Sequence, residues 1–285
     1  MKITCLCPTY YRANCLFDSI YCFLKQNHTD KRLLICDDTG SYQPLNYKGV
    51  QVVPVSKTFR TLPEKYNAMV GMSDPDTSIF AVWEDDDLYM PWHLKSIAAT
   101  LELFSGPTAY YYDTVMSDDG EKMRLEQTGG RFHASLGFNR ECFEVTGGWK
   151  VTPEASFDLQ FIGRLTPFVQ RSYQEPSYYF RWGRSDGYHG QSAMAGYHDK
   201  EWTEKARTNL QSVHKDKMSY NESYRFRHYC MTDIQGLMLR KFIDWCITGV
   251  PSKDYDFEKL LSPVVKAVGG LDNLDFTRLN TALNS

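Results

Sequence analysis

The chain has 285 residues, of which 42% are hydrophobic and 24% charged, and its formal net charge is -3 at pH 7. This length suits one large domain, or one domain with an appended subdomain, and the composition is that of an ordinary globular protein. The small negative charge argues against binding nucleic acid through bulk attraction, although residues 225–228 could still form a local basic groove.

The amino terminus and the cysteines bear on the compartment. Residues 1–4 run straight into a strand pattern without the features of a secretory signal, and no apolar run approaches the ~20 residues that cross a bilayer. The eight cysteines fall mostly inside apolar patterns, and none forms a C-x-x-C pair. We therefore expect a cytoplasmic protein without a transmembrane segment, whose cysteines are reduced and buried.

Strand and helix patterns alternate through the first 112 residues. Short apolar runs predict buried strands at 3–7, 33–36, 50–55, 79–83 and 109–112. Between them, apolar residues at helical spacing predict helices near 14–24, with Asn14 as N-cap, and near 62–70 and 94–104. Strands too apolar to face water, separated by helices, predict an α/β fold with a mostly parallel sheet covered by helices.

The pattern is mixed in the remainder of the chain. Residues 117–120 indicate a turn, 140–145 and 157–165 indicate helices, and 168–173 and 178–182 indicate strands. We divide the chain into a body, residues 1–195, and a helical carboxyl-terminal extension, residues 196–285. Within the body, we distinguish one half, residues 1–112, from a second half, residues 113–195.

An acidic run, Glu84–Asp87, follows the expected strand 79–83 directly. Like charges at this density repel one another, and a bound divalent cation would relieve the repulsion. Oxygen ligands suit hard ions such as Mg2+ or Mn2+. The alternative is a solvated acidic turn. The position at the end of a buried strand, just before Pro91, favours the metal site.

Polar residues follow two further strands. Pro8, Thr9 and Tyr10 come after the first strand, and Asp37 and Asp38 come after the second. Because the carboxyl ends of parallel strands lie at one edge of a sheet, these residues should meet the acidic run there. Asp38 could accept hydrogen bonds from a base or ribose, beside a metal-bound diphosphate. Taken alone, the Asp37-Asp38 pair would indicate an Asx-turn.

Six segments, taken together and in order, resemble the GT-A-fold glycosyltransferases of family 2. They are residues 8–12, 19–26, 35–38, 64–67, 83–87 and 137–149, and the resemblance covers residues 3–190. It implies a metal-dependent inverting transferase that uses a nucleotide-diphosphate sugar, most often a UDP-sugar, with Mn2+ or Mg2+. In this sequence Glu84 stands where the family has the first aspartate of D-x-D, and Tyr11 stands where it usually has asparagine.

The resemblance also assigns site residues. Asp38 matches the base-binding aspartate, and Asp86 matches the metal-binding aspartate, with His189 as a second metal or phosphate contact in a closing loop over residues 179–192. Contacts to the nucleotide sugar fall to Pro8, Thr9, Tyr10, Arg12, Asp38, Lys65, Asn67, Glu84, Asp85 and Arg181. Since glutamate is one methylene longer than aspartate, Asp85 and Asp86 are better placed than Glu84 to touch ribose or metal.

Asp158 matches the family's catalytic base at the start of a helix. A single displacement at the anomeric carbon needs a carboxylate that takes the proton of the acceptor hydroxyl. Asp158 could instead simply cap its helix, and Glu154 is the reserve candidate for the base. His133 lies opposite a family histidine, so it either meets donor or acceptor or is a buried structural residue.

Two other functions compete with glycosyl transfer. A sugar nucleotidyltransferase is expected to have a glycine-rich loop after the first strand, and residues 8–12 contain no glycine. A non-catalytic module that binds sugar nucleotides or glycans would need the donor site alone. The acceptor is left open among glycans, lipid-linked precursors, proteins, small metabolites and modified nucleic-acid bases.

Overall fold

The computed structural model describes residues 1–10, 13–40, 42–118, 123–129, 132–152, 154, 156–170 and 176–181. Arg12, His189 and the proposed extension 196–285 lie outside the described residues, as do most of the proposed closing loop and the side chain of Arg181.

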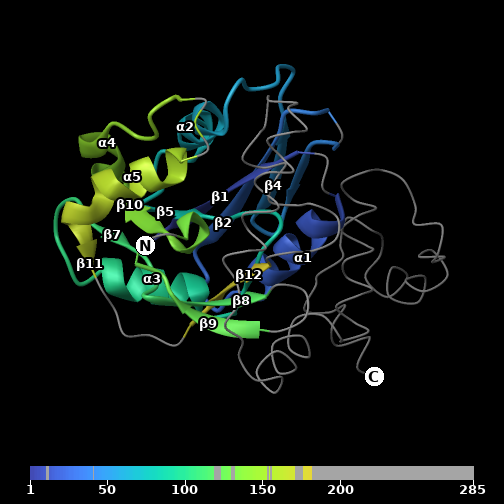
Figure 1. The fold of residues 1–285 in the computed structure, drawn as a ribbon. Helices are drawn as coiled ribbons and strands as arrows, with labels where there is room; N and C mark the ends of the chain where they lie inside the picture. The colour runs from blue at the N-terminus through green and yellow to red at the C-terminus, as the bar shows by residue number, and fades with distance from the viewer. Residues whose placement is uncertain are drawn as a thin grey trace, which may run out of the picture.

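A large sheet forms the centre of the molecule (Figure 1). Its eight strands run in the order β11-β7-β10-β5-β1-β2-β4-β3. Their bounds are β1 (Ile3–Thr9), β2 (Lys31–Asp37), β3 (Leu45–Tyr47), β4 (Val50–Pro54), β5 (Ile79–Val82), β7 (Ala109–Tyr110), β10 (Gly137–Asn139) and β11 (Val169–Gln170). Strands β5, β1, β2 and β4 pair in parallel, which confirms the expected parallel core, whereas β3 and β10 pair antiparallel to their neighbours.

Helices cover both faces of this sheet. Their bounds are α1 (Ala13–Leu24), α2 (Leu62–Met72), α3 (His93–Leu101), α4 (Arg140–Thr146) and α5 (Phe157–Leu165). Helices α2, α4 and α5 gather on one side, and α1 and α3 lie on the other (Figure 1). Neighbouring residues of β10 show the two faces, because Phe138 packs against Phe143 and Phe161 while a Cβ on Gly137 would meet Ile97 of α3.

Local signals set the helix ends. Thr61 caps α2 by accepting a hydrogen bond from the Glu64 amide, and Pro63 stands in the first turn. Asn139 caps α4 in the same way, and Gly147 ends it in the left-handed conformation. Helix α1 begins at Ala13, so Asn14 is inside the helix and not at its cap as expected.

A second sheet of four strands was not expected. Its order is β6-β12-β8-β9, with β6 (Leu88–Tyr89), β8 (Thr114–Asp118), β9 (Met123–Gln127) and β12 (Tyr178–Arg181). Residues 117 and 118, expected to start a turn, belong to β8 and extend its ladder to β9. Strand β6 begins right after Asp87, so this sheet starts at the acidic run.

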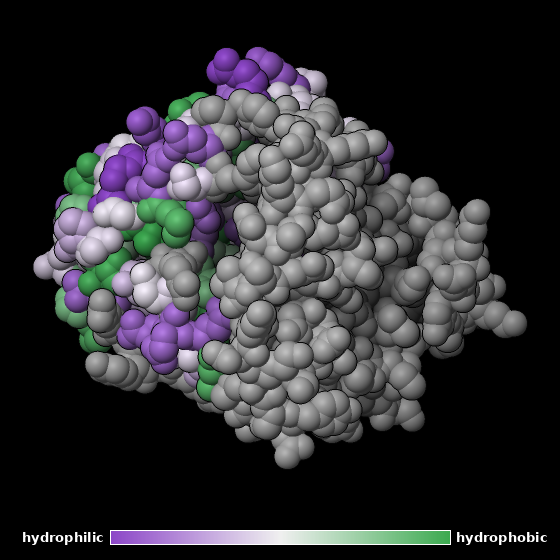
Figure 2. Space-filling view, viewed as in Figure 1, coloured by the Kyte–Doolittle hydropathy of each residue, from purple (hydrophilic) through white to green (hydrophobic). Residues whose placement is uncertain are grey.

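The described surface mixes hydrophilic and hydrophobic side chains on the face that Figure 2 shows. Of the described cysteines, Cys5, Cys7, Cys22, Cys36 and Cys142 are buried thiols outside any disulfide, as expected of cysteines in apolar patterns. Among the described helices, none combines the length and apolar character that would let it span a bilayer.

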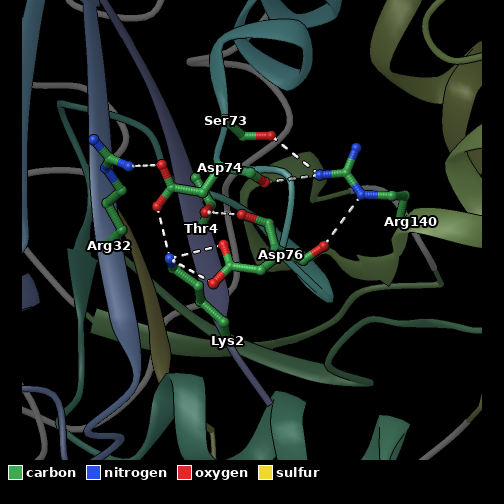
Figure 3. Close-up of polar contacts among 8 residues, drawn as sticks. Lys2, Thr4, Arg32, Ser73, Asp74, Asp76 and Arg140 are labelled. Atoms are coloured by element: carbon green, nitrogen blue, oxygen red, sulfur yellow. Dashed lines mark hydrogen bonds and ion pairs between the residues drawn. The ribbon is translucent and has the colours of Figure 1, made fainter.

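Ion pairs tie the amino-terminal edge of the sheet together (Figure 3). Asp74 accepts from both Lys2, at 2.7 Å, and Arg32, and Lys2 also reaches Asp76 at 2.9 Å. Arg140, at the start of α4, donates to the backbone oxygen of Asp74 at 3.1 Å. This network joins β1, β2, the segment before β5 and α4 at the ends opposite the acidic run.

Candidate active site

Lys65 and Asp38 form a buried ion pair where β1 and β2 end. The ammonium of Lys65, on α2, donates to Asp38 Oδ1 at 2.5 Å and to the backbone oxygen of Thr9 at 2.7 Å. The Phe59 amide donates to Asp38 Oδ2 at 2.9 Å. Helix α2 therefore fixes the Asp38 carboxylate, whose remaining lone pairs can still accept from a base.

Asp37, the neighbouring carboxylate, makes the Asx-turn that the sequence left open. Its Oδ1 accepts from the Thr39 amide at 2.9 Å and its Oδ2 from the Tyr42 amide at 3.0 Å. Asp37 is therefore structural, and Asp38 is the member of the pair that faces Lys65.

The acidic run is buried at the carboxyl end of β5. Asp85, Asp86 and Asp87 each expose 1% or less of their surface, so the solvated-turn alternative is wrong. Asp85 Oδ2 accepts from the Thr9 hydroxyl at 2.7 Å, and Asp87 Oδ2 accepts from the Tyr178 hydroxyl at 2.5 Å. The run is thus bound to the end of β1 on one side and to β12 on the other.

Three carboxylates of this run face one another. Glu84, Asp86 and Asp87 each offer an oxygen, and these oxygens lie within 4.8 Å of one another. An all-oxygen group of this kind fits Mg2+ or Mn2+. The resemblance had pointed to Asp86 and had given Asp87 no role. In the sequence, only the unbroken acidic run indicates that Asp87 could be a ligand. The bend after β5 brings its carboxylate oxygen close to those of Glu84 and Asp86.

Asp158 is the second residue of α5, and Ser156 at the N-cap position makes no side-chain capping hydrogen bond. Burial raises the pKa of Asp158, while the nearby His133 and the Leu159 amide, which donates to Oδ1 at 2.7 Å, act to lower it. Glu154, the reserve candidate, is exposed and accepts from Gln160. The burial of Asp158 favours proton uptake by its carboxylate, as a general base requires.

His133 stands between the acidic run and Asp158. Its Nδ1 lies 3.5 Å from Glu84 Oε1, and its Nε2 accepts from the Trp149 indole at 2.9 Å. Burial lowers the pKa of His133 to about 4, although the Asp158 charge acts to raise it. The imidazole is therefore neutral near pH 7 and connects the residues expected to bind metal with the expected base.

Asn67 clamps the turn that carries Trp149. Its Nδ2 donates to the Trp149 backbone oxygen at 2.7 Å, and its Oδ1 accepts from the Trp149 amide at 2.9 Å. Gly148 has φ +65, and a Cβ there would lie 2.7 Å from both Asn67 Oδ1 and the Phe143 ring. Asn67 therefore positions Trp149, and its expected contact with the nucleotide sugar stays a prediction.

The other expected contacts lie along the end of β1. Pro8 is buried within the strand, and Tyr10 follows it half-buried. Of the expected residues, the structure brings Thr9, Asp38, Lys65, Glu84, Asp85 and Asp86 to one edge of the sheet.

No protein-family model matches the chain, and no curated protein sequence matches it. The structure is similar to S. aureus TarS residues 1–349, with TM-score 0.54 and 11% identity over 84% of this chain and 77% of that one. TarS in complex with UDP-GlcNAc gives TM-score 0.53 and 10% identity, with 85% and 79% covered. TarS in complex with UDP gives 0.54 and 12%, with 86% and 87% covered. This likeness confirms the expected GT-A glycosyltransferase fold.

Proposed function

We propose that this protein is a metal-dependent inverting glycosyltransferase of the family 2 type. It moves a sugar from a nucleotide-diphosphate donor, a UDP-sugar, to an acceptor hydroxyl. The observation that carries the proposal is the convergence of Glu84, Asp86 and Asp87 at the sheet edge that also holds Asp38. The TarS structures with UDP and UDP-GlcNAc support this choice of donor by their common fold.

Glu84, Asp86 and Asp87 would hold the divalent cation, which supplies charge neutralisation for the departing diphosphate. Asp38 is fixed by Lys65 and binds the base through its free lone pairs. Thr9 holds Asp85 and so keeps the acidic run against the end of β1. Arg12 would add a contact to the nucleotide sugar, Arg181 a contact to the phosphates, and His189 a contact to metal or phosphate, as the resemblance implies.

Asp158 acts as the base in this proposal. It takes the proton of the acceptor hydroxyl while the new bond from that oxygen to the anomeric carbon forms and the bond to the diphosphate oxygen breaks. A direct displacement of this kind inverts the anomeric configuration. The raised pKa of Asp158 makes its carboxylate a better proton acceptor than an ordinary aspartate. Residues 1–112 thus supply the donor site, and residues 113–195 supply the base.

The test is release of nucleoside diphosphate from UDP-glucose, UDP-galactose, UDP-GlcNAc and GDP-mannose, with Mn2+ or Mg2+ and a panel of acceptors. We expect release from a UDP-sugar that requires the cation and stops in excess EDTA. Undiminished release in EDTA would contradict the metal site. Donor binding without turnover on any acceptor would favour a non-catalytic sugar-nucleotide module instead.

A further inference from the structure

Two buried hydrogen-bond donors next to the acidic run have no acceptor among the described residues. They are the hydroxyl of Tyr66, whose side chain is fully buried, and Nδ1 of His133, which is 5% exposed. A buried donor without an acceptor destabilises the folded chain, so such groups are uncommon and call for an explanation. Two at one place indicate that an acceptor arrives with a ligand.

Packing fixes the direction of both donors. The Tyr66 ring stacks on Trp149 with centroids 4.8 Å apart and meets the edge of His133 at 5.2 Å. The Trp149 indole donates to His133 Nε2, so in the neutral imidazole the proton is on Nδ1. The Asn67 side chain holds the Trp149 backbone through two hydrogen bonds, so the indole that stacks on Tyr66 and donates to His133 is itself held in place.

Both donors border the site from the same side. His133 Nδ1 points toward Glu84, whose Oε1 is 3.5 Å away without a hydrogen bond between them. Burial raises the pKa of the Tyr66 hydroxyl, and the charges of Glu84 and Asp86 act in the same direction. The charge of Asp158 acts on His133 from the other direction. His133 therefore lies between the acidic run and the base, and Tyr66 lies beside it.

We propose that Tyr66 and His133 bind hydroxyl oxygens of the transferred sugar and help to select it. This rests on the proposed function, in which the sugar must lie between the diphosphate at the acidic run and the acceptor at Asp158. Both donors are uncharged, which suits neutral hydroxyls, whereas diphosphates are bound by cations. A buried donor that binds a sugar hydroxyl also discriminates strongly between sugars. A sugar without that hydroxyl would leave the donor unpaired.

The test compares Tyr66→Phe with the wild type. We first identify which of UDP-glucose, UDP-galactose and UDP-GlcNAc the wild type binds most tightly. Calorimetry in Mn2+ then measures the affinity of each protein for that UDP-sugar and for UDP. We expect the UDP-sugar to bind about tenfold more weakly and UDP to stay within about twofold. The melting temperature without ligand should stay or rise, since the substitution removes an unpaired buried hydroxyl. His133→Gln, which keeps an acceptor for Trp149 but loses the Nδ1 donor, should have the same selective effect.

Tyr110→Phe is the control, because Tyr110 is a buried tyrosine on β7. None of the acidic residues 84–87 is among the groups that shift its pKa. It should leave both affinities unchanged. If Tyr66→Phe weakens UDP and the UDP-sugar equally, or weakens neither, the sugar contact is refuted while the proposed function stands. If the wild type binds no nucleotide in Mn2+, the proposed function fails, and the sugar contact fails with it.

Discussion

The two edges of the central sheet treat their carboxylates in opposite ways. At the amino-terminal edge, Asp74 and Asp76 face cations, with Lys2 between them and Arg32 on Asp74 (Figure 3). At the carboxyl-terminal edge, the oxygens of Glu84, Asp86 and Asp87 face one another.

On the proposed function, this difference separates a structural cluster from a metal-binding one. Side chains at the amino edge satisfy each other, so their net effect is to join strands and a helix. The carboxyl edge collects like charges at the place where open α/β sheets bind ligands. An arrangement of that kind is costly for folding alone, and the cation of the proposed function would offset this cost.

Asp86→Ala should break the carboxyl edge most severely. It removes one of the three converging oxygens, so we expect turnover of the nucleotide sugar to fall by about a thousandfold, the several kcal/mol that a bound cation supplies to the transition state. The measurement is nucleoside-diphosphate release in saturating Mn2+. Asp76→Asn, at the amino edge, is the matched control and should retain wild-type turnover. Equal losses of turnover in the two variants would contradict the proposed difference between the edges.

Asp158→Asn should lower kcat by about a hundredfold or more, because an amide cannot take a proton, while donor affinity stays within a few-fold. Burial raises the pKa of Asp158, so the carboxylate is lost to protonation at a higher pH than for an ordinary aspartate. The wild-type kcat should therefore fall on acidification earlier than an ordinary aspartate would allow. If kcat is unchanged in Asp158→Asn, Asp158 is not the base.

Acid should destabilise the carboxyl edge through His133. Its pKa is about 4 in the folded chain and about 6.5 when unfolded, so the unfolded chain binds the proton first and stability is lost as pH falls below 6.5. Between pH 7 and 5 the loss from this group should be about 2 kcal/mol. His93, with a pKa of about 3, adds a similar loss.

Urea unfolding at pH 7 and pH 5 measures this effect. In His133→Gln the difference between the two pH values should shrink by about 2 kcal/mol. In the control His28→Gln, whose ring reaches the backbone of Met1 at the amino edge, the difference should persist. An unchanged difference in His133→Gln would show that the imidazole is not held neutral.

Asp74→Asn should give the smallest effect. The carboxylate is partly exposed, so its ion pairs with Lys2 and Arg32 are screened, and we expect a loss of about 1 kcal/mol in the free energy of unfolding. Nucleotide affinity should not change, since the network lies at the opposite edge. Calorimetric unfolding and UDP titration measure the two quantities, and weaker UDP binding by this variant would contradict a purely structural amino edge.

The sequence predicted the elements that have strong periodicity. Strands β1, β2, β4 and β5 overlap the expected strands 3–7, 33–36, 50–55 and 79–83, and α5 spans the expected residues 157–165. The sequence did not predict the second sheet, because β6 has only two residues and residues 117 and 118 have the polar pattern of a turn. Strand β10 is three residues long, too short for an alternation to show. In each case long-range pairing, which no local pattern reports, makes the strand.

For the site, topology alone brought Asp38 and the acidic run to one edge, as the order of strands predicts. The Lys65–Asp38 pair joins residues 27 positions apart, and the Trp149–His133 bond joins residues 16 apart across a turn. Such contacts depend on how α2 and the turn before α5 dock, which residue types do not specify. The neutral state of His133 likewise follows from burial that only the folded chain shows.

The most direct measurement is a titration of Mn2+ followed by electron paramagnetic resonance, with and without UDP, on the wild type and on Asp86→Asn. We expect the wild type to bind one Mn2+, UDP to tighten this binding, and Asp86→Asn to lose both effects. Mn2+ binding that is equal in the two proteins, or absent from the wild type with UDP present, would contradict the proposed metal site.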